Sequence, residues 1–204
     1  MNITSEILEQ AMRLFDSAGV VAEETGVVLI LGLGSTPERD LDDFALEGGR
    51  LVFRGWGKHV KPRVMALRNL LQDRGFTAEA VGWWGYPMAA EVMHLKRLAV
   101  IAGLGQQGKN TLVLDPKFGP WLRLAAMRTN APLTPTGPGI YERQENPLCQ
   151  SCHACINVCP IEGLLEPYRL LDPARCLLNI ESDLVQDKLG WCLMGCVTRC
   201  PVGR

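Results

Sequence analysis

Residues 149–160 read CQSCHACINVCP, and residues 192–201 read CLMGCVTRCP. In the first stretch, three cysteines stand three positions apart, and a fourth cysteine follows after three further residues and precedes a proline. This spacing matches the bacterial ferredoxin motif C-x2-C-x2-C-x3-C-P. The second stretch ends in the same C-x3-C-P pattern. We therefore expect the C-terminal part of the chain to fold around iron–sulfur clusters.

The number of cysteines fits two clusters. The chain has 8 cysteines, and all of them lie in its C-terminal part. Two [4Fe–4S] clusters bind four thiolates each, and the last cysteine of a ferredoxin run binds the other cluster of the pair. The expected ligands of the first cluster are Cys149, Cys152, Cys155 and Cys200, and those of the second are Cys159, Cys176, Cys192 and Cys196.

Two other uses of these cysteines are open. Zinc sites use C-x2-C pairs, but two such pairs usually stand at a longer separation. A disulfide framework requires an oxidising compartment, and the first residues of the chain lack the apolar stretch of an export signal. The spacing favours two iron–sulfur clusters over both alternatives.

Composition restricts the class of protein. The chain has 204 residues, 47% of them hydrophobic, and a formal net charge of −1. This balance is typical of a globular protein and gives no cationic surface for nucleic acid. The apolar runs at 26–34 and 98–104 are too short to cross a bilayer. We therefore expect a cytoplasmic protein with no nucleic-acid and no membrane partner.

The pattern of residues predicts an α+β protein with two domains. Residues 1–130 contain no cysteine and form the first domain, residues 131–147 are a proline-rich linker, and residues 148–204 form the cluster domain. Helices are expected near 7–15, ended by Gly19, and at 62–75 and 87–102. Strands are expected at 27–33, 76–81, 111–114 and 121–128, with the last two on either side of a turn. The acidic stretch 38–47 is expected to be a solvated loop or helix face.

A glycine-rich turn precedes the cluster domain. Residues 103–110 read GLGQQGKN and come close to two phosphate-binding motifs. The dinucleotide motif requires a following helix, and the P-loop requires Ser or Thr where Asn110 stands. Three glycines in six residues still indicate a close approach to the backbone, either by a ligand or within a tight turn.

Two stretches of the chain resemble epoxyqueuosine reductases, which are related to reductive dehalogenases. The first stretch is AGLGQQGKNTLVLDPKFGPWLRLAAMRTNAPL at 102–133. The second runs from CQSCHACINVCP through PYRLLDPARCLLNIE at 167–181 to CLMGCVTRCP, and its two ends, 149–160 and 192–201, are called the cysteine segments below. The match covers about residues 55–204. The resemblance implies cobalamin and two [4Fe–4S] clusters, with a nitroreductase-like domain that holds the corrinoid against a ferredoxin-like domain. By the same resemblance, the residues that line the corrinoid would be Gly103, Gly105, Gly108, Lys109 and Asn110.

The sequence also departs from that family. No aspartate stands between Asp73 and Asp115, where the family has an essential one, and the chain stops shortly after Cys200, where the family continues. Three residues separate Cys192 from Cys196 where the family usually has two. We therefore expect a relative that does not itself reduce epoxyqueuosine in tRNA.

Aromatic residues before the glycine-rich turn are candidates for the site. By analogy with dehalogenases, Tyr86 could donate a proton to a reduced substrate. Trp83 and Trp84 could cover a corrinoid face. Packing in the core is the alternative for all three side chains.

These observations lead to one functional prediction and two alternatives. We expect a corrinoid-dependent iron–sulfur reductase that receives single electrons from a low-potential ferredoxin or flavoprotein. The first alternative is a non-enzymatic electron carrier that docks on a partner corrinoid protein. The second is a structural iron–sulfur module that senses redox state.

Overall fold

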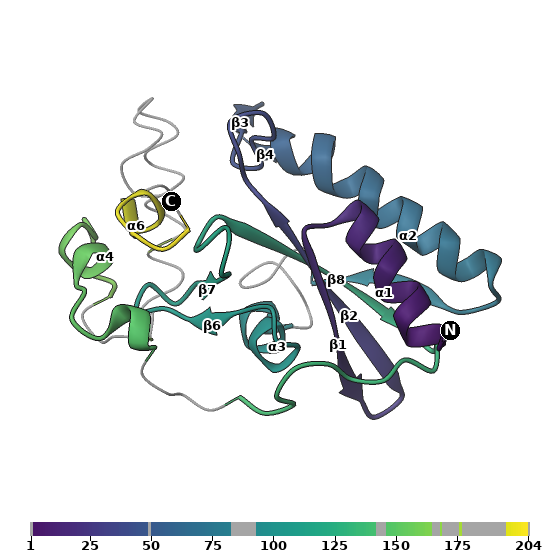
Figure 1. The fold of residues 1–204 in the computed structure, drawn as a ribbon. Coiled ribbons are helices and arrows are strands. Elements are labelled where there is room, and N and C mark those ends of the chain that lie inside the picture. The colour runs from purple at the N-terminus through teal and green to yellow at the C-terminus, as the bar shows by residue number, and fades with distance from the viewer. Residues whose placement is uncertain are drawn as a thin grey trace.

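The computed structural model describes residues 2–48, 50–82, 93–141, 146–164, 168, 176 and 195–203. A sheet of four strands in the order β1-β2-β8-β5 lies at the centre of the N-terminal part of the chain (Figure 1). The strands are β1 (Ser17–Glu23), β2 (Gly26–Gly34), β5 (Ala78–Val81) and β8 (Leu122–Thr129). Each neighbouring pair in this sheet is antiparallel. Helices lie on both faces of this sheet, so the described residues combine α and β structure as predicted.

Strand β2 is buried along almost its whole length. Leu29 pairs with Val20 of β1 on one side and with Met127 of β8 on the other. Alternate residues of a strand point to opposite faces of the sheet. In β2, both sets of side chains are buried, so this strand is a continuous apolar run rather than an alternating one. The strand predicted at 27–33 is thus confirmed.

Helices cover the two faces of the sheet. The helices α1 (Ile3–Leu14) and α2 (Lys61–Asp73) pack on one face, and α3 (Leu95–Ile101) packs on the other (Figure 1). Helix α1 begins at Asn2, whose side chain accepts a hydrogen bond from the Thr4 amide at 3.2 Å. Its buried residues Ile7 and Ala11 stand one turn apart and face the sheet.

Short elements connect the sheet to the cysteine segments. The hairpin β6 (Gln106–Gln107) and β7 (Val113–Leu114) follows α3. The cysteine segments contain the 3-10 helix η2 (Pro147–Cys149), α4 (Ala154–Asn157) and α6 (Gly195–Thr198). Figure 1 shows β6 and β7 between the sheet and the pair α4 and α6. A second hairpin, β3 (Phe44–Glu47) and β4 (Arg50–Phe53), and the π-helix η1 (Trp56–Val60) lead into α2.

Several predicted boundaries are wrong. Gly19 does not end a helix, because it lies within β1, where a Cβ would stand 2.6 Å from the Ala102 carbonyl oxygen. The helix predicted at 87–102 begins only at Leu95 among the described residues, since 93 and 94 are not helical and 83–92 lie outside the description.

The pairing of two predicted strands also differs from the structure. Strand β7 pairs with β6 rather than with β8, and β8 joins the central sheet instead. The acidic stretch 38–47 contains β3, so it is not a solvated loop or helix face throughout. Phe44 of β3 packs its ring against Phe53 of β4, with the ring centroids 4.9 Å apart. None of the described helices is long and apolar enough to cross a membrane.

Candidate functional site

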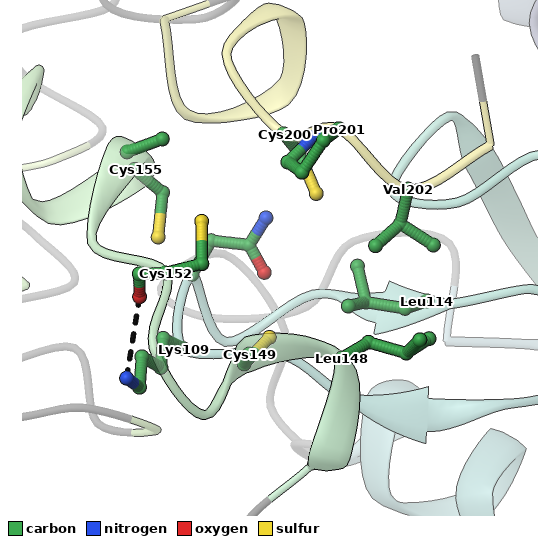
Figure 2. Close-up of a pocket in the computed structure, with 11 residues that line it drawn as sticks. Lys109, Leu114, Leu148, Cys149, Cys152, Cys155, Cys200, Pro201 and Val202 are labelled. Carbon is green, nitrogen blue, oxygen red and sulfur yellow. Dashed lines mark hydrogen bonds between the residues drawn. The ribbon is translucent and has the colours of Figure 1, made fainter.

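Four of the predicted ligands meet at one pocket. Cys149, Cys152 and Cys155 line it together with Cys200, which comes from the other end of the cysteine segments. Figure 2 shows their sulfur atoms arranged around a common space. The structure therefore brings together the four residues that the spacing assigned to the first cluster.

Local hydrogen bonds position these cysteines. Asn146 is 2% exposed, and its side-chain oxygen accepts a hydrogen bond from the Leu148 amide at 3.0 Å, which caps η2 just before Cys149. The Cys152 amide donates to the Cys149 carbonyl at 3.0 Å, and the Cys200 amide donates to Val197 at 3.2 Å. Sequence analysis did not single out Asn146. Its position before Pro147 is the signal that could have identified a cap.

The wall of the pocket is mostly apolar. Leu114, Leu148, Pro201 and Val202 line it beside the cysteines. Burial raises the pKa of the Cys155 thiol to about 11, and Cys196, Cys149 and Cys200 add to this rise. Iron–sulfur clusters bind thiolates, so the free Cys155 thiol must lose its proton when a cluster binds.

The second predicted ligand set is partly described. Cys192 lies outside the described residues, whereas Cys159, Cys176 and Cys196 lie within them. The Sγ atom of Cys159 accepts a hydrogen bond from the Gly163 amide at 3.3 Å. Amide hydrogen bonds to sulfur are among the features that tune iron–sulfur clusters.

Lys96 interacts electrostatically with two cysteines of this second set. Its ammonium donates to the Thr111 hydroxyl at 3.4 Å. The pKa of Lys96 is lowered, chiefly because the surrounding protein desolvates the ammonium, while Cys176 and Cys196 both oppose this shift. Much of the Lys96 residue surface is nevertheless exposed. Cys176 and Cys196 thus act on the same ammonium, and the sequence pattern does not predict this role of Lys96.

A single metal ion would need a tighter arrangement of donors. Among the described ranges, no three His, Cys, Asp or Glu side chains form a group that could hold one metal ion. A [4Fe–4S] cluster has a different requirement, because each cysteine binds its own iron atom of a larger core. Four cysteines spread around a pocket fit that requirement.

Lys109 and Asn110 hold the cysteine segments against the glycine-rich turn. Both residues are 4% exposed. The Lys109 ammonium donates to the carbonyl oxygens of Gln150 at 3.1 Å and Cys152 at 3.2 Å, and Figure 2 shows the second bond. The Asn110 amide donates to the Cys196 carbonyl at 3.3 Å. The glycine-rich turn therefore contacts both cysteine segments.

The chain itself approaches the glycines of this turn. A Cβ on Gly103 would stand 2.9 Å from the Gly137 Cα, and one on Gly105 would stand 2.4 Å from the Leu114 carbonyl oxygen. At Gly108, a Cβ would stand 2.8 Å from the Asn110 side-chain oxygen. Packing within the chain therefore gives a reason for each of the three glycines.

The aromatic candidates Trp83, Trp84 and Tyr86 lie outside the described residues. A second, open cavity of about 420 Å³ lies close to that segment in the sequence, because Met93 and His94 line it. Arg97 also lines this cavity, and its guanidinium lies 5.3 Å from the centre of the Tyr141 ring. None of the three glycines of the turn is among the residues that line this cavity.

The chain is similar to curated epoxyqueuosine reductases, although no family model matches it. The protein of Pseudomonas aeruginosa is 34% identical over 130 residues, which cover 63% of this chain and 33% of that protein. The protein of Synechococcus sp. is 30% identical over 154 residues, which cover 70% of this chain and 44% of that protein. The chain therefore spans less than half the length of these relatives.

Solved structures share the fold. An epoxyqueuosine reductase with a tRNA-Tyr epoxyqueuosine-modified stem loop has a TM-score of 0.66 at 19% identity and covers 98% of this chain and 64% of its own. A catabolic reductive dehalogenase with 3-bromo-4-hydroxybenzoic acid has a TM-score of 0.65 at 17% identity, covering 97% and 31%. A dehalogenase described as B12-dependent has a TM-score of 0.52 at 16% identity, covering 77% and 25%.

These matches confirm the predicted resemblance to epoxyqueuosine reductases and reductive dehalogenases. The predicted cofactors agree with relatives of this kind. The matches do not support the prediction that the chain is not an epoxyqueuosine reductase, and they do not favour the electron-carrier alternative. The predicted lack of a nucleic-acid partner also finds no support, because one relative was solved with a tRNA stem loop.

Proposed function

We propose that this chain is an iron–sulfur oxidoreductase that passes single electrons through two [4Fe–4S] clusters to a bound corrinoid. The convergence of Cys149, Cys152 and Cys155 with Cys200 on one pocket supports this function most directly. When bound, the clusters supply one-electron transfer and the corrinoid supplies the centre that reduces the substrate.

The proposal assigns each cysteine to one cluster. The first cluster is bound by Cys149, Cys152, Cys155 and Cys200, and the second by Cys159, Cys176, Cys192 and Cys196. Residues 148–204 would form a ferredoxin-like domain, joined by residues 131–147 to a nitroreductase-like domain at 1–130. The first four cysteines share a pocket, as this assignment requires, and Cys176 acts with Cys196 on Lys96, while Cys196 also acts on Cys155.

The residues around the first pocket create the environment that such a cluster requires. Leu114 and Val202 keep water from the sulfur atoms, and Cys149 and Cys200 are only 8% and 7% exposed. In these surroundings, charges interact more strongly than they do in water. The cysteine loop is held by Lys109 through hydrogen bonds to its backbone, so the ligands are fixed in place before a cluster binds.

Support for a corrinoid comes from the relatives rather than from the described residues. One solved dehalogenase is described as B12-dependent. In this chain, Gly103, Gly105 and Gly108 pack against the chain itself, while Lys109 and Asn110 contact the cysteine segments. The corrinoid would therefore contact this turn through its backbone, with Trp83, Trp84 and Tyr86 as further candidates and Tyr86 as the proton donor.

Epoxyqueuosine in tRNA is the first substrate to test. The curated relatives are named for its reduction, and one solved relative was crystallised with a tRNA stem loop that carries it. The reduction consumes two electrons and two protons and releases the epoxide oxygen as water. A low-potential ferredoxin or flavoprotein would supply the electrons one at a time. The absence of an aspartate between Asp73 and Asp115 means that another group, such as Tyr86, would donate a proton, with the second proton coming from water.

Anaerobic purification tests the cofactor part of this proposal. The protein should contain about eight iron and about eight sulfide ions per chain, as two cubanes require. Its absorption spectrum should change when cobalamin is added, and equilibrium dialysis should show bound cobalamin. Stoichiometric zinc without iron, or clusters without cobalamin binding, would contradict the proposal.

A turnover assay tests the substrate. The loaded protein, a strong one-electron reductant and tRNA containing epoxyqueuosine are incubated anaerobically, and queuosine is measured by mass spectrometry of the digested tRNA. We expect several queuosines per protein molecule. A protein that holds both cofactors but forms no queuosine would limit the proposal to a reductase with a different substrate.

A further inference from the structure

Lys109 is a buried cation beside the first group of cysteines. It is 4% exposed and lines the pocket that the four cysteines share. Among the ion pairs of the described residues, none includes Lys109. Its ammonium is satisfied instead by the carbonyl oxygens of Gln150 and Cys152. A buried charge is costly unless hydrogen bonds or an opposite charge compensate for it.

A bound cluster would provide the opposite charge. Four thiolates outweigh the positive charge of a [4Fe–4S] core, so the assembly is an anion, and a one-electron reduction makes it more negative. Lys109 therefore interacts more favourably with the reduced form than with the oxidised form. A nearby fixed cation raises the reduction potential of such a group, because net charge and hydrogen bonding set that potential.

Other described cations in this part of the chain are placed differently, and Arg199, which precedes Cys200, is exposed. Lys117 is exposed, and its ammonium lies 4.8 Å from the centre of the Phe118 ring. Lys96 interacts with Cys176 and Cys196, which belong to the other ligand set. Solvent screens an exposed charge far more than a buried one. Lys109 is thus the described cation with the strongest expected effect on the first cluster alone.

We propose that Lys109 sets the reduction potential of the cluster bound by Cys149, Cys152, Cys155 and Cys200. It is a positioning residue with an electrostatic role, since it holds the loop of Gln150 and Cys152 and places one fixed positive charge at the pocket. This inference rests on the proposed function, because it requires a cluster in that pocket. The charge makes this cluster easier to reduce than it would be without Lys109.

The test compares reduction potentials in cluster-loaded proteins. Wild type, Lys109→Gln, Lys109→Arg and the exposed control Lys117→Gln are titrated anaerobically with dithionite, and the reduced clusters are followed by electron paramagnetic resonance. The signal of the first cluster is the one that changes in Cys200→Ser. In Lys109→Gln, we expect at least a tenfold lower ratio of reduced to oxidised first cluster at a given potential, which equals a shift of about 59 mV. The second cluster should move less, and both Lys109→Arg and Lys117→Gln should resemble wild type.

Each other result has a definite meaning. If both clusters shift equally in Lys109→Gln, if neither shifts, or if Lys109→Arg shifts as far, the inference is wrong while the proposed function stands. If Lys109→Gln does not assemble, Lys109→Met is the second neutral variant, because its side chain fills a similar space. If neither neutral variant binds its clusters while Lys109→Arg does, the charge is needed for cluster assembly. That result would also overturn the inference. A wild type without iron would instead refute the proposed function.

Discussion

Asn110 donates a hydrogen bond from its side-chain amide to the main-chain carbonyl oxygen of Cys196 at 3.3 Å. The oxygen of the same side chain accepts a hydrogen bond from the Leu112 amide at 3.1 Å. The buried Asn110 side chain therefore stabilises its own turn and also holds a cysteine segment that lies far along the chain. Neighbouring Lys109 does the same for the other cysteine segment.

Removing the Asn110 amide should destabilise the protein. Asn110→Ala leaves the Cys196 carbonyl and the Leu112 amide without this partner, which costs roughly 1–3 kcal/mol for a buried group. For a chain of this size, each kcal/mol lowers Tm by about 2–4 °C. Anaerobic thermal unfolding followed by circular dichroism measures the change. The exposed Asn157→Ala is the matched control, and an equal Tm for the two variants would contradict the role of Asn110.

Cysteine substitutions should separate the two clusters. Cys200 shares a pocket with Cys149, Cys152 and Cys155, so Cys200→Ser should disturb the first cluster only. The iron content should fall by up to half, and the electron paramagnetic resonance signal of the second cluster should persist. Cys176→Ser should produce the reverse pattern. If Cys200→Ser removed the signal that Cys176→Ser also removes, the proposed ligand sets would be incorrect.

The elements that the sequence predicts well are those with a strong repeating signal. Strand β2 was predictable because both of its faces are buried, which makes an uninterrupted apolar run. The convergence of Cys200 with the first cysteine run was predictable because cluster chemistry dictates the spacing of ligands. In both cases, burial or cluster binding restricts which residue types can stand at a position, and the sequence shows those residue types directly.

Other features depend on contacts that no local pattern reveals. Strand β7 has two residues, too few for periodicity to indicate its partner, and it pairs with β6. The letters GKN suggest a phosphate or corrinoid turn, but they do not show which way the side chains point. In the structure, Lys109 and Asn110 point to the cysteine segments, and only the tertiary arrangement determines that direction.

The glycine at position 105 should be required for folding rather than for a ligand. A Cβ there would stand 2.4 Å from the Leu114 carbonyl oxygen, which is backbone and cannot move aside easily. Gly105→Ala should therefore cost about 1–3 kcal/mol or more through overpacking. Denaturant unfolding of the metal-free protein measures this. Gly57→Ala is the control, because nothing lies within 4 Å of its Cβ position. Full stability of Gly105→Ala together with lost cobalamin binding would instead indicate direct ligand contact.

The protonation of Cys155 should make cluster assembly depend on pH. Burial raises the pKa of this thiol to about 11 from a usual value of 9.0. The neutral thiol therefore contributes stability to the metal-free fold that is complete below about pH 9 and is lost as the pH rises through 11. At neutral pH almost no thiolate is present at this position, although thiolate is the form that binds iron.

Alkylation of the metal-free protein measures this effect at Cys155. Thiolate is the nucleophile, so two pKa units make Cys155 react with iodoacetamide about a hundredfold more slowly at pH 8 than in the urea-unfolded chain. The rate should then rise about tenfold for each pH unit until it levels near pH 11. Mass spectrometry of the peptide containing Cys155 gives both rates, and the unfolded chain is the internal reference. Equal rates in the folded and unfolded protein at pH 8 would show that the thiol is not protected.

With the expected protection, reconstitution with iron and sulfide should proceed faster at pH 9 than at pH 7, because the proton on Cys155 must leave before the first cluster closes.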